Sequence, residues 1–311
     1  MNKKIALTGA TGFVGRHLLK ELISNGYTVT ALTRRPQQPQ ENVKWVIGDF
    51  AEKTALHELV KDADIIINVA GLVKARTKSD YFAANADAVT NLLSAIKTST
   101  KNPHFIQVST LAAREAHISN YAASKHQGEM HLKNNKMDIN WTIIRPPGVY
   151  GPKDSETLKI FKALTWRIAL SPSSSSLRVS WIHVSDLVKA ISHLVENQNY
   201  YKQTIEVDDG QDNGYSHKEF YTIAAKILQI KPLNITLPKF ILKAIGHIND
   251  IVGRIFDYTP MVSAMKVNEM CHPNWVCQKK NEPQIKGWSP EYDLESGLKD
   301  TLDWYTKNNY I

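Results

Sequence analysis

Short apolar runs alternate with amphipathic stretches along the first half of the chain. The runs are rich in β-branched residues, which is typical of buried strands, whereas the stretches between them carry apolar residues at helical spacing. Strands are expected at 4–8, 27–33, 43–47, 64–70, 104–109 and 139–145, and helices at 13–24, 54–61, 81–97 and 120–133. Apolar strands that alternate with helices predict βαβ units. The expected fold class is therefore α/β, with a doubly wound parallel sheet of the Rossmann type.

The rhythm of the pattern changes after Pro152. A low-complexity loop is expected over 171–178, and short strands at 181–183 and 204–207 are expected to rejoin the sheet. From His217 onward the pattern is mostly helical.

These changes predict two regions within the 311 residues. A dinucleotide-binding Rossmann core is expected over 1–208, with residues 151–178 contributing to the substrate pocket. A smaller, mostly helical substrate-binding cap region is expected over 209–311. The length of the chain is ample for a large core and a cap.

One segment of the expected cap carries a wide apolar stripe at helical spacing. The stripe comprises Leu237, Phe240, Ile241, Ala244, Ile245, Ile248, Ile251, Val252, Ile255 and Phe256. It predicts a helix face that is buried on the domain, and a dimer contact and a lipid-facing surface are the alternatives.

Basic residues outnumber acidic ones, and the formal net charge is +8. Such a charge attracts phosphates, nucleic acid or an anionic membrane surface. The basic residues are scattered, however, with adjacent pairs at 3–4, 34–35 and 279–280. We therefore expect a solvated basic surface and no nucleic-acid partner.

The sequence lacks the run of about 18 uncharged apolar residues that a transmembrane helix needs. Its first residues lack the apolar run of a signal peptide. A cytoplasmic protein is therefore expected, and peripheral contact with a membrane stays open. Cys271 and Cys277 lack the spacing of a metal site and the context of a disulfide framework, so neither is expected.

A glycine-rich segment joins the first expected strand to the first expected helix. Glycines at this spacing close a tight turn and let the backbone approach a pyrophosphate, while the helix N-terminus offers N–H groups and a positive partial charge. The expected cofactor contacts here are Gly9, Thr11, Gly12, Phe13, Val14 and Gly15. The segment predicts a dinucleotide site.

The end of the second strand bears on the choice of cofactor. An NAD enzyme usually places a carboxylate there, which binds the ribose 2′-hydroxyl. Here Arg34 and Arg35 follow Thr33, and two guanidinium groups suit a 2′-phosphate. NADP is therefore the expected cofactor, with NAD as the alternative.

Further motifs follow in one order along the chain. After T-G-A-T-G-F-V-G at 8–15 come G-D-F at 48–50, N-V-A-G at 68–71, Asn85, V-S-T at 108–110, Y-A-A-S-K at 121–125 and R-P-P-G-V-Y-G-P at 145–152. The chain resembles the short-chain dehydrogenase/reductase superfamily, in its extended and atypical branches that include the NAD-dependent epimerase/dehydratase family. The resemblance covers nearly the whole chain, because G-W-S-P at 287–290 and L-E-S-G-L at 294–298 are similar to the closing segment of those proteins.

The resemblance implies cofactor contacts outside the glycine-rich segment. They are Asp49 and Phe50 at the adenine, Ala70 and Gly71 under the cofactor, Val108 and Ser109 at the end of the strand beneath the nicotinamide, and Pro146 and Val149 at its carboxamide. Asn85 is a further expected cofactor contact.

Tyr121 and Lys125 are one helical turn apart in the expected helix at 120–133. A free tyrosine has a pKa of about 10, and a nearby ammonium group favours the phenolate and lowers that pKa. Tyr121 would then exchange a proton with a substrate oxygen while a hydride moves to or from the nicotinamide. The resemblance implies that Lys125 also bonds the nicotinamide ribose, and that Thr110, with Ser109 as its rival, holds the substrate oxygen.

Two positions depart from the members of the family that act on nucleotide sugars. Gly148 replaces an Asn and Val179 replaces an Arg, and both of those residues are diphosphate anchors in such members. Arg178 is one residue away from the second anchor and would point to the other side of a strand. The pattern is closer to the hydroxysteroid dehydrogenase and dihydroflavonol reductase branches, which handle apolar alcohols and ketones.

Three functions stay open at this point. The first is an NADP-dependent oxidoreductase of a small, largely apolar alcohol or ketone. The second is an epimerase or dehydratase that keeps its cofactor bound and recycles the hydride. The third is a non-catalytic NADP-binding regulator or assembly subunit, although Tyr121 and Lys125 are both present. Family analogy alone allows a homodimer through the helices at 81–97 and 120–133.

Overall fold

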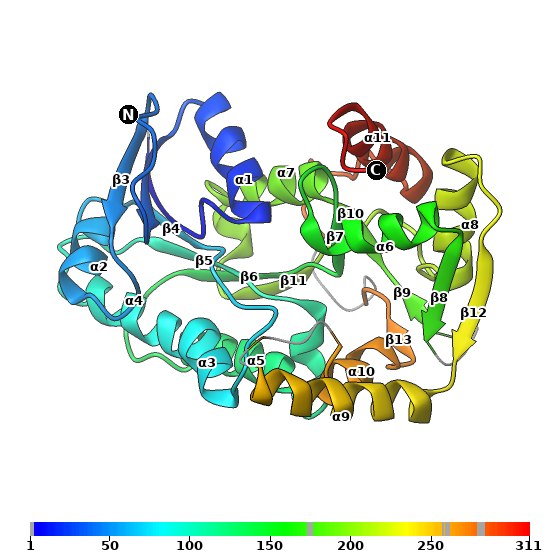
Figure 1. The fold of residues 1–311 in the computed structure, drawn as a ribbon. Helices are drawn as coiled ribbons and strands as arrows, with labels where there is room; N and C mark the ends of the chain where they lie inside the picture. Colours follow the sequence, from blue (N-terminus) through cyan, green and yellow to red (C-terminus); the bar gives the residue numbers. More distant parts are fainter. Residues whose placement is uncertain (1–2, 173–176, 257, 259–261, 279–283) are drawn as a thin grey trace. The chain divides into compact units, whose positions relative to one another are not determined.

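The computed structural model describes residues 3–172, 177–256, 258, 262–278 and 284–311 (Figure 1). The chain divides into two compact units that alternate along the sequence. Unit 1 comprises residues 1–145, 188–206 and 279–288, and unit 2 comprises residues 146–187, 207–278 and 289–311.

The sequence predicted a single boundary, at residue 208. One junction between the units lies close to it, between Glu206 and Val207, but residues 146–187 belong to unit 2 although they precede the expected boundary. The assignment of substrate binding to residues 209–311 stays a prediction.

Unit 1 is built on a seven-stranded sheet in which every neighbouring pair of strands is parallel. The strands are β1 (Lys4–Thr8), β2 (Thr28–Thr33), β3 (Val43–Ile47), β4 (Ile65–Asn68), β5 (His104–Val108), β6 (Trp141–Arg145) and β11 (Gln203–Glu206). Their order is β11-β6-β5-β4-β1-β2-β3, which confirms the doubly wound Rossmann sheet. The order reverses between β1 and β4, where Thr8 lies beside Asn68. Ligands of such sheets bind outside the carboxyl ends of the strands at this point.

Helices flank the sheet of unit 1 (Figure 1). They are α1 (Phe13–Ser24), α2 (Lys53–Val60), α3 (Lys78–Phe82), α4 (Ala88–Ile96) and α5 (Asn120–Lys133), with short 3-10 helices at Leu111–Glu115 and Gln198–Tyr200. Helices α1 and α5 have the bounds that the sequence predicted. The helix expected at 81–97 is present as a helical segment without a break from Lys78 to Ile96, but a π-helical turn at Ala83–Asp87, which the sequence did not predict, lies between α3 and α4. Helix α7 (Val184–Leu194) begins in unit 2 and ends in unit 1.

The core of unit 1 explains why the sheet holds its register. Ile66 and Phe105 of the sheet pack with Leu56 of α2 and Leu92 of α4, and all four side chains are almost fully buried. Burial of each such side chain contributes roughly 1.5–3 kcal/mol. A slip by one residue would turn these side chains to the opposite face of the sheet. The strand ends that carry the candidate site are thereby fixed.

In its described residues, unit 2 contains three short parallel strand pairs and most of the remaining helices. The pairs are β7 (Gly148–Tyr150) with β10 (Trp181–His183), β8 (Ile168–Pro172) with β12 (Leu233–Leu237), and β9 (Arg178–Val179) with β13 (Asn274–Trp275). The helices are α6 (Ser155–Thr165), α8 (His217–Ile227), α9 (Lys239–Ile255), α10 (Ala264–Met270) and α11 (Leu294–Lys307). The expectation that 181–183 rejoins the large sheet is wrong, because this strand pairs with β7. Residues 173–176 of the expected low-complexity loop lie outside the described residues.

The apolar stripe at 237–256 lies on α9, but most of it is not buried on unit 2. Phe240, Ile248, Ile251 and Ile255 are all exposed, whereas Leu242 is buried in a small cluster with Val267 and Cys271. The prediction of a buried face is therefore wrong for most of the stripe. Among the described residues, no helix is both long enough and apolar enough to cross a membrane.

Candidate active site

The glycine-rich segment forms a tight turn between β1 and α1. Gly9 has a φ of +71°, and its carbonyl oxygen accepts a hydrogen bond from the N–H of Gly12 at 2.9 Å. A Cβ at Gly15 would lie 1.9 Å from the carbonyl oxygen of Gly9, and a Cβ at Gly9 would lie 2.7 Å from the backbone nitrogen of Ala70. The turn thus closes against both the first turn of α1 and the end of β4.

This turn fits a pyrophosphate group. Gly12 is the N-cap residue of α1 and has no side chain with which to cap the helix. The N–H groups of the first helical turn need acceptors from outside the helix, and a helix N-terminus carries a positive partial charge. A phosphate group supplies the matching acceptors and charge. The contacts expected from Thr11, Phe13 and Val14 stay predictions.

Arg16 is a residue of this site that the sequence reasoning missed. Its Nε donates a hydrogen bond to the carbonyl oxygen of Gly12 at 3.1 Å, and its Nη2 donates to that of Thr11 at 2.9 Å. The guanidinium group therefore braces the glycine turn from the exposed side of α1. Its position directly after the last glycine was the signal that could have found it.

Arg34 and Arg35 are both exposed and directly follow the end of β2. The Thr33 hydroxyl donates to the carbonyl oxygen of Arg35 at 2.8 Å and accepts from its N–H at 3.3 Å. This local turn holds the two arginines at the carboxyl edge of the sheet, beside the strand that carries the glycine turn. Their pairing with a phosphate stays a prediction.

Asp49 and Phe50 follow β3 at the same edge. The Asp49 carboxylate is exposed and accepts a hydrogen bond from the N–H of Ala51 at 2.7 Å. The Phe50 ring packs against the core of unit 1, and its carbonyl oxygen accepts from the Asn91 amide at 2.9 Å. The structure thus fixes this turn before α2, and the expected adenine contact stays a prediction.

A buried row of hydrogen bonds links three strand ends below the site. The Thr8 hydroxyl of β1 donates to Asn68 of β4 at 2.5 Å, and the Asn68 amide donates to Gln107 of β5 at 2.8 Å. The Gln107 amide in turn donates to the carbonyl oxygen of Val108 at 3.0 Å. Since unpaired polar groups in a core are costly, this row aligns the strand ends with one another.

Asn85 lies inside the π-helical turn and is buried. Its amide donates to the carbonyl oxygen of Leu72 at 3.0 Å and to the Ser124 hydroxyl at 2.9 Å, while its oxygen accepts from the Leu72 N–H at 2.9 Å. A Cβ at Gly71 would lie 2.7 Å from that oxygen. Asn85 therefore holds the segment after β4 against α5. The direct cofactor contacts expected from Asn85, Ala70 and Gly71 stay predictions.

The two candidate hydroxyls, Ser109 and Thr110, have different surroundings. The buried Ser109 hydroxyl donates to a carboxylate oxygen of Glu129 at 2.6 Å. The Thr110 side chain is half-buried, and its hydroxyl accepts from the N–H of Ala112 at 3.3 Å, at the start of the 3-10 helix. That contact leaves the Thr110 hydroxyl proton available for another acceptor.

Glu129 is the centre of a buried charged network. Arg145 binds its carboxylate with two hydrogen bonds, at 2.8 Å and 2.6 Å, and Lys133 lies 3.5 Å from it. Arg145 also lies 3.8 Å from Glu206, which pairs with Arg114 at 3.1 Å. Burial raises the pKa of the Glu129 carboxyl, but the hydrogen bonds and charge of Arg145 outweigh burial and hold that pKa below its ordinary value.

Tyr121 and Lys125 lie on α5, which begins where the Ser119 hydroxyl accepts from the N–H of Ala122. Lys125 is buried, and its Nζ donates to the carbonyl oxygen of Val108 at 2.7 Å. Burial lowers the pKa of Lys125 to about 8, although the Glu129 carboxylate opposes the shift. Tyr121 is half-buried in the first turn of α5, and its ring centroid lies 6.4 Å from that of Tyr81. The structure thus brings the expected acid/base pair to the edge that carries the glycine turn.

Pro146 and Val149 lie in unit 2, unlike every other predicted site residue. Pro146 is buried, and Val149 is paired with Ile182 in the β7–β10 pair. Their expected contact with the nicotinamide carboxamide stays a prediction.

Comparisons with known proteins agree with this geometry. A family model described as the NAD dependent epimerase/dehydratase family matches residues 5–207. The chain belongs to this family. Among the relatives of this epimerase/dehydratase family protein, a ceramide reductase from Caulobacter vibrioides is 34% identical over 311 residues, which is 99% of this chain and 96% of that protein. A UDP-glucose 4-epimerase from Vibrio cholerae is 24% identical over 340 residues, 99% of this chain and 97% of that protein.

Solved structures of other proteins share the fold. A UDP-glucose 4-epimerase from Thermotoga maritima has a TM-score of 0.77 and 18% identity, covering 98% of this chain and 99% of that one. A human epimerase family protein, solved with NADPH, has a TM-score of 0.76 and 15% identity, covering 96% and 99%. Membership of the family makes this protein an NAD(P)-dependent enzyme, either an oxidoreductase or an epimerase. The non-catalytic alternative is therefore set aside.

Proposed function

We propose that this epimerase/dehydratase family protein is an NADP-dependent oxidoreductase that interconverts a ketone and a secondary alcohol on a ceramide-class lipid. The observation that carries the reaction type is the arrangement of Tyr121 and Lys125 on α5, with Lys125 bonded to the end of β5. The substrate class comes from the ceramide reductase, whose likeness extends over nearly the whole chain.

The chemistry divides between cofactor and protein. A bound nicotinamide would supply a hydride to the carbonyl carbon, or accept one from the carbinol carbon in the reverse direction. In the reducing direction Tyr121 donates a proton to the carbonyl oxygen, so that hydride and proton together convert the ketone to an alcohol. The Lys125 ammonium and the N-terminal end of α5 both favour the negative charge that remains on the phenol oxygen.

Thr110 is the hydroxyl that we assign to the substrate oxygen. Ser109 donates its proton to Glu129, whereas Thr110 only accepts in the contact with Ala112. A hydroxyl that holds a carbonyl oxygen must donate to it, and Thr110 retains that proton. Ser109 instead acts through the buried network of Glu129.

Arg34 and Arg35 support NADP as the cofactor. Both are exposed at the end of β2, where an NAD enzyme usually carries a carboxylate. Arg16 adds a third guanidinium group at the glycine turn. Charge-assisted, bidentate bonds from arginine suit the ribose 2′-phosphate.

Contacts within unit 2 support a substrate that lacks a diphosphate. A Cβ at Gly148 would lie 2.6 Å from the Trp181 ring, so the Asn found there in nucleotide-sugar enzymes would require Trp181 to move. Arg178, the nearest cation to the missing second anchor, is paired with Glu219 at 2.5 Å. The neighbouring Val179 pairs with Trp275 on β13.

The test is a reduction assay with NADPH and a ketone-bearing ceramide in detergent micelles. We expect substrate-dependent loss of the reduced-nicotinamide absorbance. Tyr121→Phe should lower turnover at least about a hundredfold, with NADPH affinity within a few-fold of wild type. Tyr81→Phe removes a phenol oxygen from the neighbouring ring and is the matched control, with turnover near that of wild type.

Three results would contradict the proposal. Full activity of Tyr121→Phe would exclude its proton-transfer role, and equal losses in both tyrosine variants would indicate a local packing effect. Epimerisation of UDP-glucose without net change in cofactor, and no reaction with the lipid ketone, would favour the epimerase instead.

A further inference from the structure

Helix α9 turns its most apolar side outward. Phe240, Ile248, Ile251 and Ile255 are 72%, 60%, 57% and 69% exposed. Together with the exposed Ala244 they recur every three or four residues, so they form one continuous stripe along the 17-residue helix. We call these five residues the α9 stripe. Soluble proteins rarely leave such a large apolar patch in water unless it binds something.

The opposite side of α9 already provides its packing within unit 2. A Cβ at Gly246 would lie 2.6 Å from the backbone nitrogen of Ala264, so α9 and α10 approach closely there. Leu242 is buried against α10, and the Asn249 amide donates to the carbonyl oxygen of Val262 at 3.1 Å. The packing of α9 on α10 therefore rests on the side of α9 opposite to the α9 stripe.

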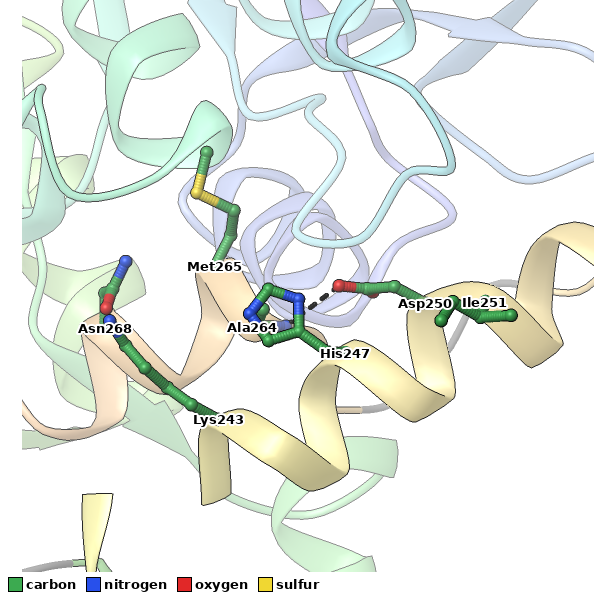
Figure 2. A pocket seen from close by; sticks show the side chains of 7 residues that line it. All are labelled: Lys243, His247, Asp250, Ile251, Ala264, Met265 and Asn268. Atoms are coloured by element: carbon green, nitrogen blue, oxygen red, sulfur yellow. Dashed lines mark hydrogen bonds between the residues drawn. The ribbon is translucent and has the colours of Figure 1, made fainter. Parts of the chain in front are cut away.

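One edge of the stripe is basic. Lys239, Lys243 and His247 follow one another at intervals of four residues along the same side of α9. A hollow of about 420 Å³ lies beside this edge, lined by Lys243 and His247 of α9 and by Met265 and Asn268 of α10 (Figure 2). The acidic residue of the hollow, Asp250, accepts a hydrogen bond from the N–H of Ala264 at 3.1 Å.

We propose that the α9 stripe docks this protein on the surface of a lipid bilayer that contains anionic lipids. A helix with an exposed apolar face and a basic flank lies in the plane of the interface, with its apolar side chains among the acyl chains and its cations among the phosphates. The 17 residues of α9 give it a length of about 25 Å along the membrane. The hollow beside Lys243 and His247 then receives a lipid phosphate.

Charge favours the bilayer over a second copy of the chain. A two-fold contact through α9 would bring the same basic edge from both copies to one interface. The carboxylate that lines the hollow beside that edge, Asp250, is already bonded to α10. Lipid phosphates supply the missing negative charge.

This docking goes beyond the proposed reaction, because it involves neither NADPH nor Tyr121. It explains how an enzyme of a ceramide-class substrate would reach a molecule that stays in the membrane. The two proposals can therefore fail separately. An enzyme that reduces a lipid ketone in micelles but does not bind vesicles would refute the docking alone.

The experiment is flotation of the full-length protein with vesicles of phosphatidylcholine, with and without phosphatidylglycerol. We expect binding to the anionic vesicles, weakened by added salt because exposed charges are screened. The double substitution Ile248→Asp and Ile251→Asp should reduce vesicle binding at least about tenfold. Leu233→Asp, at an exposed apolar residue on β12, is the matched control and should bind as wild type does.

Two further variants sharpen the test. Lys243→Gln with His247→Gln should abolish the preference for anionic over neutral vesicles while the apolar contact remains. Ile251→Cys, labelled with an environment-sensitive dye, should report an apolar environment when vesicles are added. The native Cys271 and Cys277 are buried and therefore suit this labelling.

Failure of wild type to bind any vesicle would overturn the docking. So would equal binding by the double aspartate variant and by Leu233→Asp. A wild-type dimer that becomes a monomer in the double variant, without vesicle binding, would assign the α9 stripe to a second copy of the chain instead.

Discussion

The Nζ of Lys125 donates a hydrogen bond to the carbonyl oxygen of Val108 at 2.7 Å, within the protein interior. The Gln107 amide donates to the same oxygen at 3.0 Å, so two donors converge on the end of β5. This contact fixes the ammonium group one helical turn from Tyr121. It also places a cation where water cannot solvate it, and burial lowers the pKa of Lys125 to about 8.

Lys125→Met should stabilise the protein near neutral pH while abolishing activity. The folded-state pKa of about 8 lies below the ordinary lysine value of 10.5, so folding at neutral pH carries the cost of a buried charge. That cost is about 3 kcal/mol. Stability of wild type should therefore rise between about pH 8 and about pH 10, where the unfolded chain still binds a proton that the folded chain has released.

Urea unfolding at about pH 7 and about pH 10 measures this difference. The difference in free energy of unfolding between Lys125→Met and wild type should be smaller at the higher pH. Lys20→Met, at an exposed lysine on α1, is the control and should show no such trend. An advantage of Lys125→Met that does not change with pH would contradict the assignment.

Arg34→Ala combined with Arg35→Ala should weaken the binding of NADPH far more than the binding of NADH. Each charge-assisted hydrogen bond to the 2′-phosphate contributes about 1.5–3 kcal/mol, so the Kd for NADPH should rise at least about tenfold. NADH lacks the phosphate and should be affected little. Both cofactors should be titrated into wild type, into the double variant and into Lys20→Ala as the control. Equal losses of affinity for NADPH and NADH in the double variant would refute the 2′-phosphate assignment.

Glu129→Gln should destabilise unit 1 strongly, because it leaves Arg145 with one carboxylate fewer in a buried site. Loss of one partner of a buried pair costs about 3–5 kcal/mol. The pKa of Glu129 is held below its ordinary value, so its contribution is present above about pH 4.5 and is lost as the pH falls through the lower folded-state pKa. Denaturant unfolding should show a much lower free energy of unfolding for Glu129→Gln than for wild type at neutral pH. This difference should shrink as the pH is lowered.

Glu58→Gln is the matched control for that experiment. Glu58 also contacts two lysines, Lys44 and Lys61, but its side chain is 36% exposed, whereas that of Glu129 is 1% exposed. Its removal should change stability much less than the removal of Glu129. Similar losses in the two variants would show that burial is not what makes the Glu129 network important.

Gly15→Ala should weaken cofactor binding and lower the stability of the protein. A methyl group there would lie 1.9 Å from the carbonyl oxygen of Gly9, so the turn must open. We expect a lower melting temperature and NADPH affinity reduced at least about tenfold. Gly12→Ala is the comparison, because its Cβ would lie 3.2 Å from the same oxygen and its φ of −76° suits any residue. A melting temperature of Gly15→Ala equal to that of Gly12→Ala would contradict the steric argument.

Much of unit 1 could be predicted because its signals are local. The glycine at position 12 and the serine at position 119 mark the starts of α1 and α5, and both helices have the expected ends. The π-turn at Ala83–Asp87 was missed because one extra residue hardly alters an apolar pattern. Strands β8 and β12 were missed because they pair over a long stretch of sequence and carry exposed side chains such as Leu233.

The site was predicted in outline, since its residues follow the ends of parallel strands. Ser109 and Thr110 could not be separated in the sequence, because only the bond from Ser109 to Glu129 tells them apart. The apolar stripe on α9 was predicted from the spacing of its residues, but this spacing does not say which face of the helix is exposed to solvent. That depends on where Gly246 permits close packing against α10.

The π-turn around Asn85 lets the helical segment 78–96 hold one residue more than a regular α-helix of the same length. Removal of a single residue from 83–87 would therefore let α3 and α4 join as one regular helix with little rotation of either part. Tyr81 would keep its place beside Tyr121, and the buried face of α4 would keep its contacts. The loss would fall on the widened turn itself, and so on the bonds from the Asn85 amide to Leu72 and Ser124.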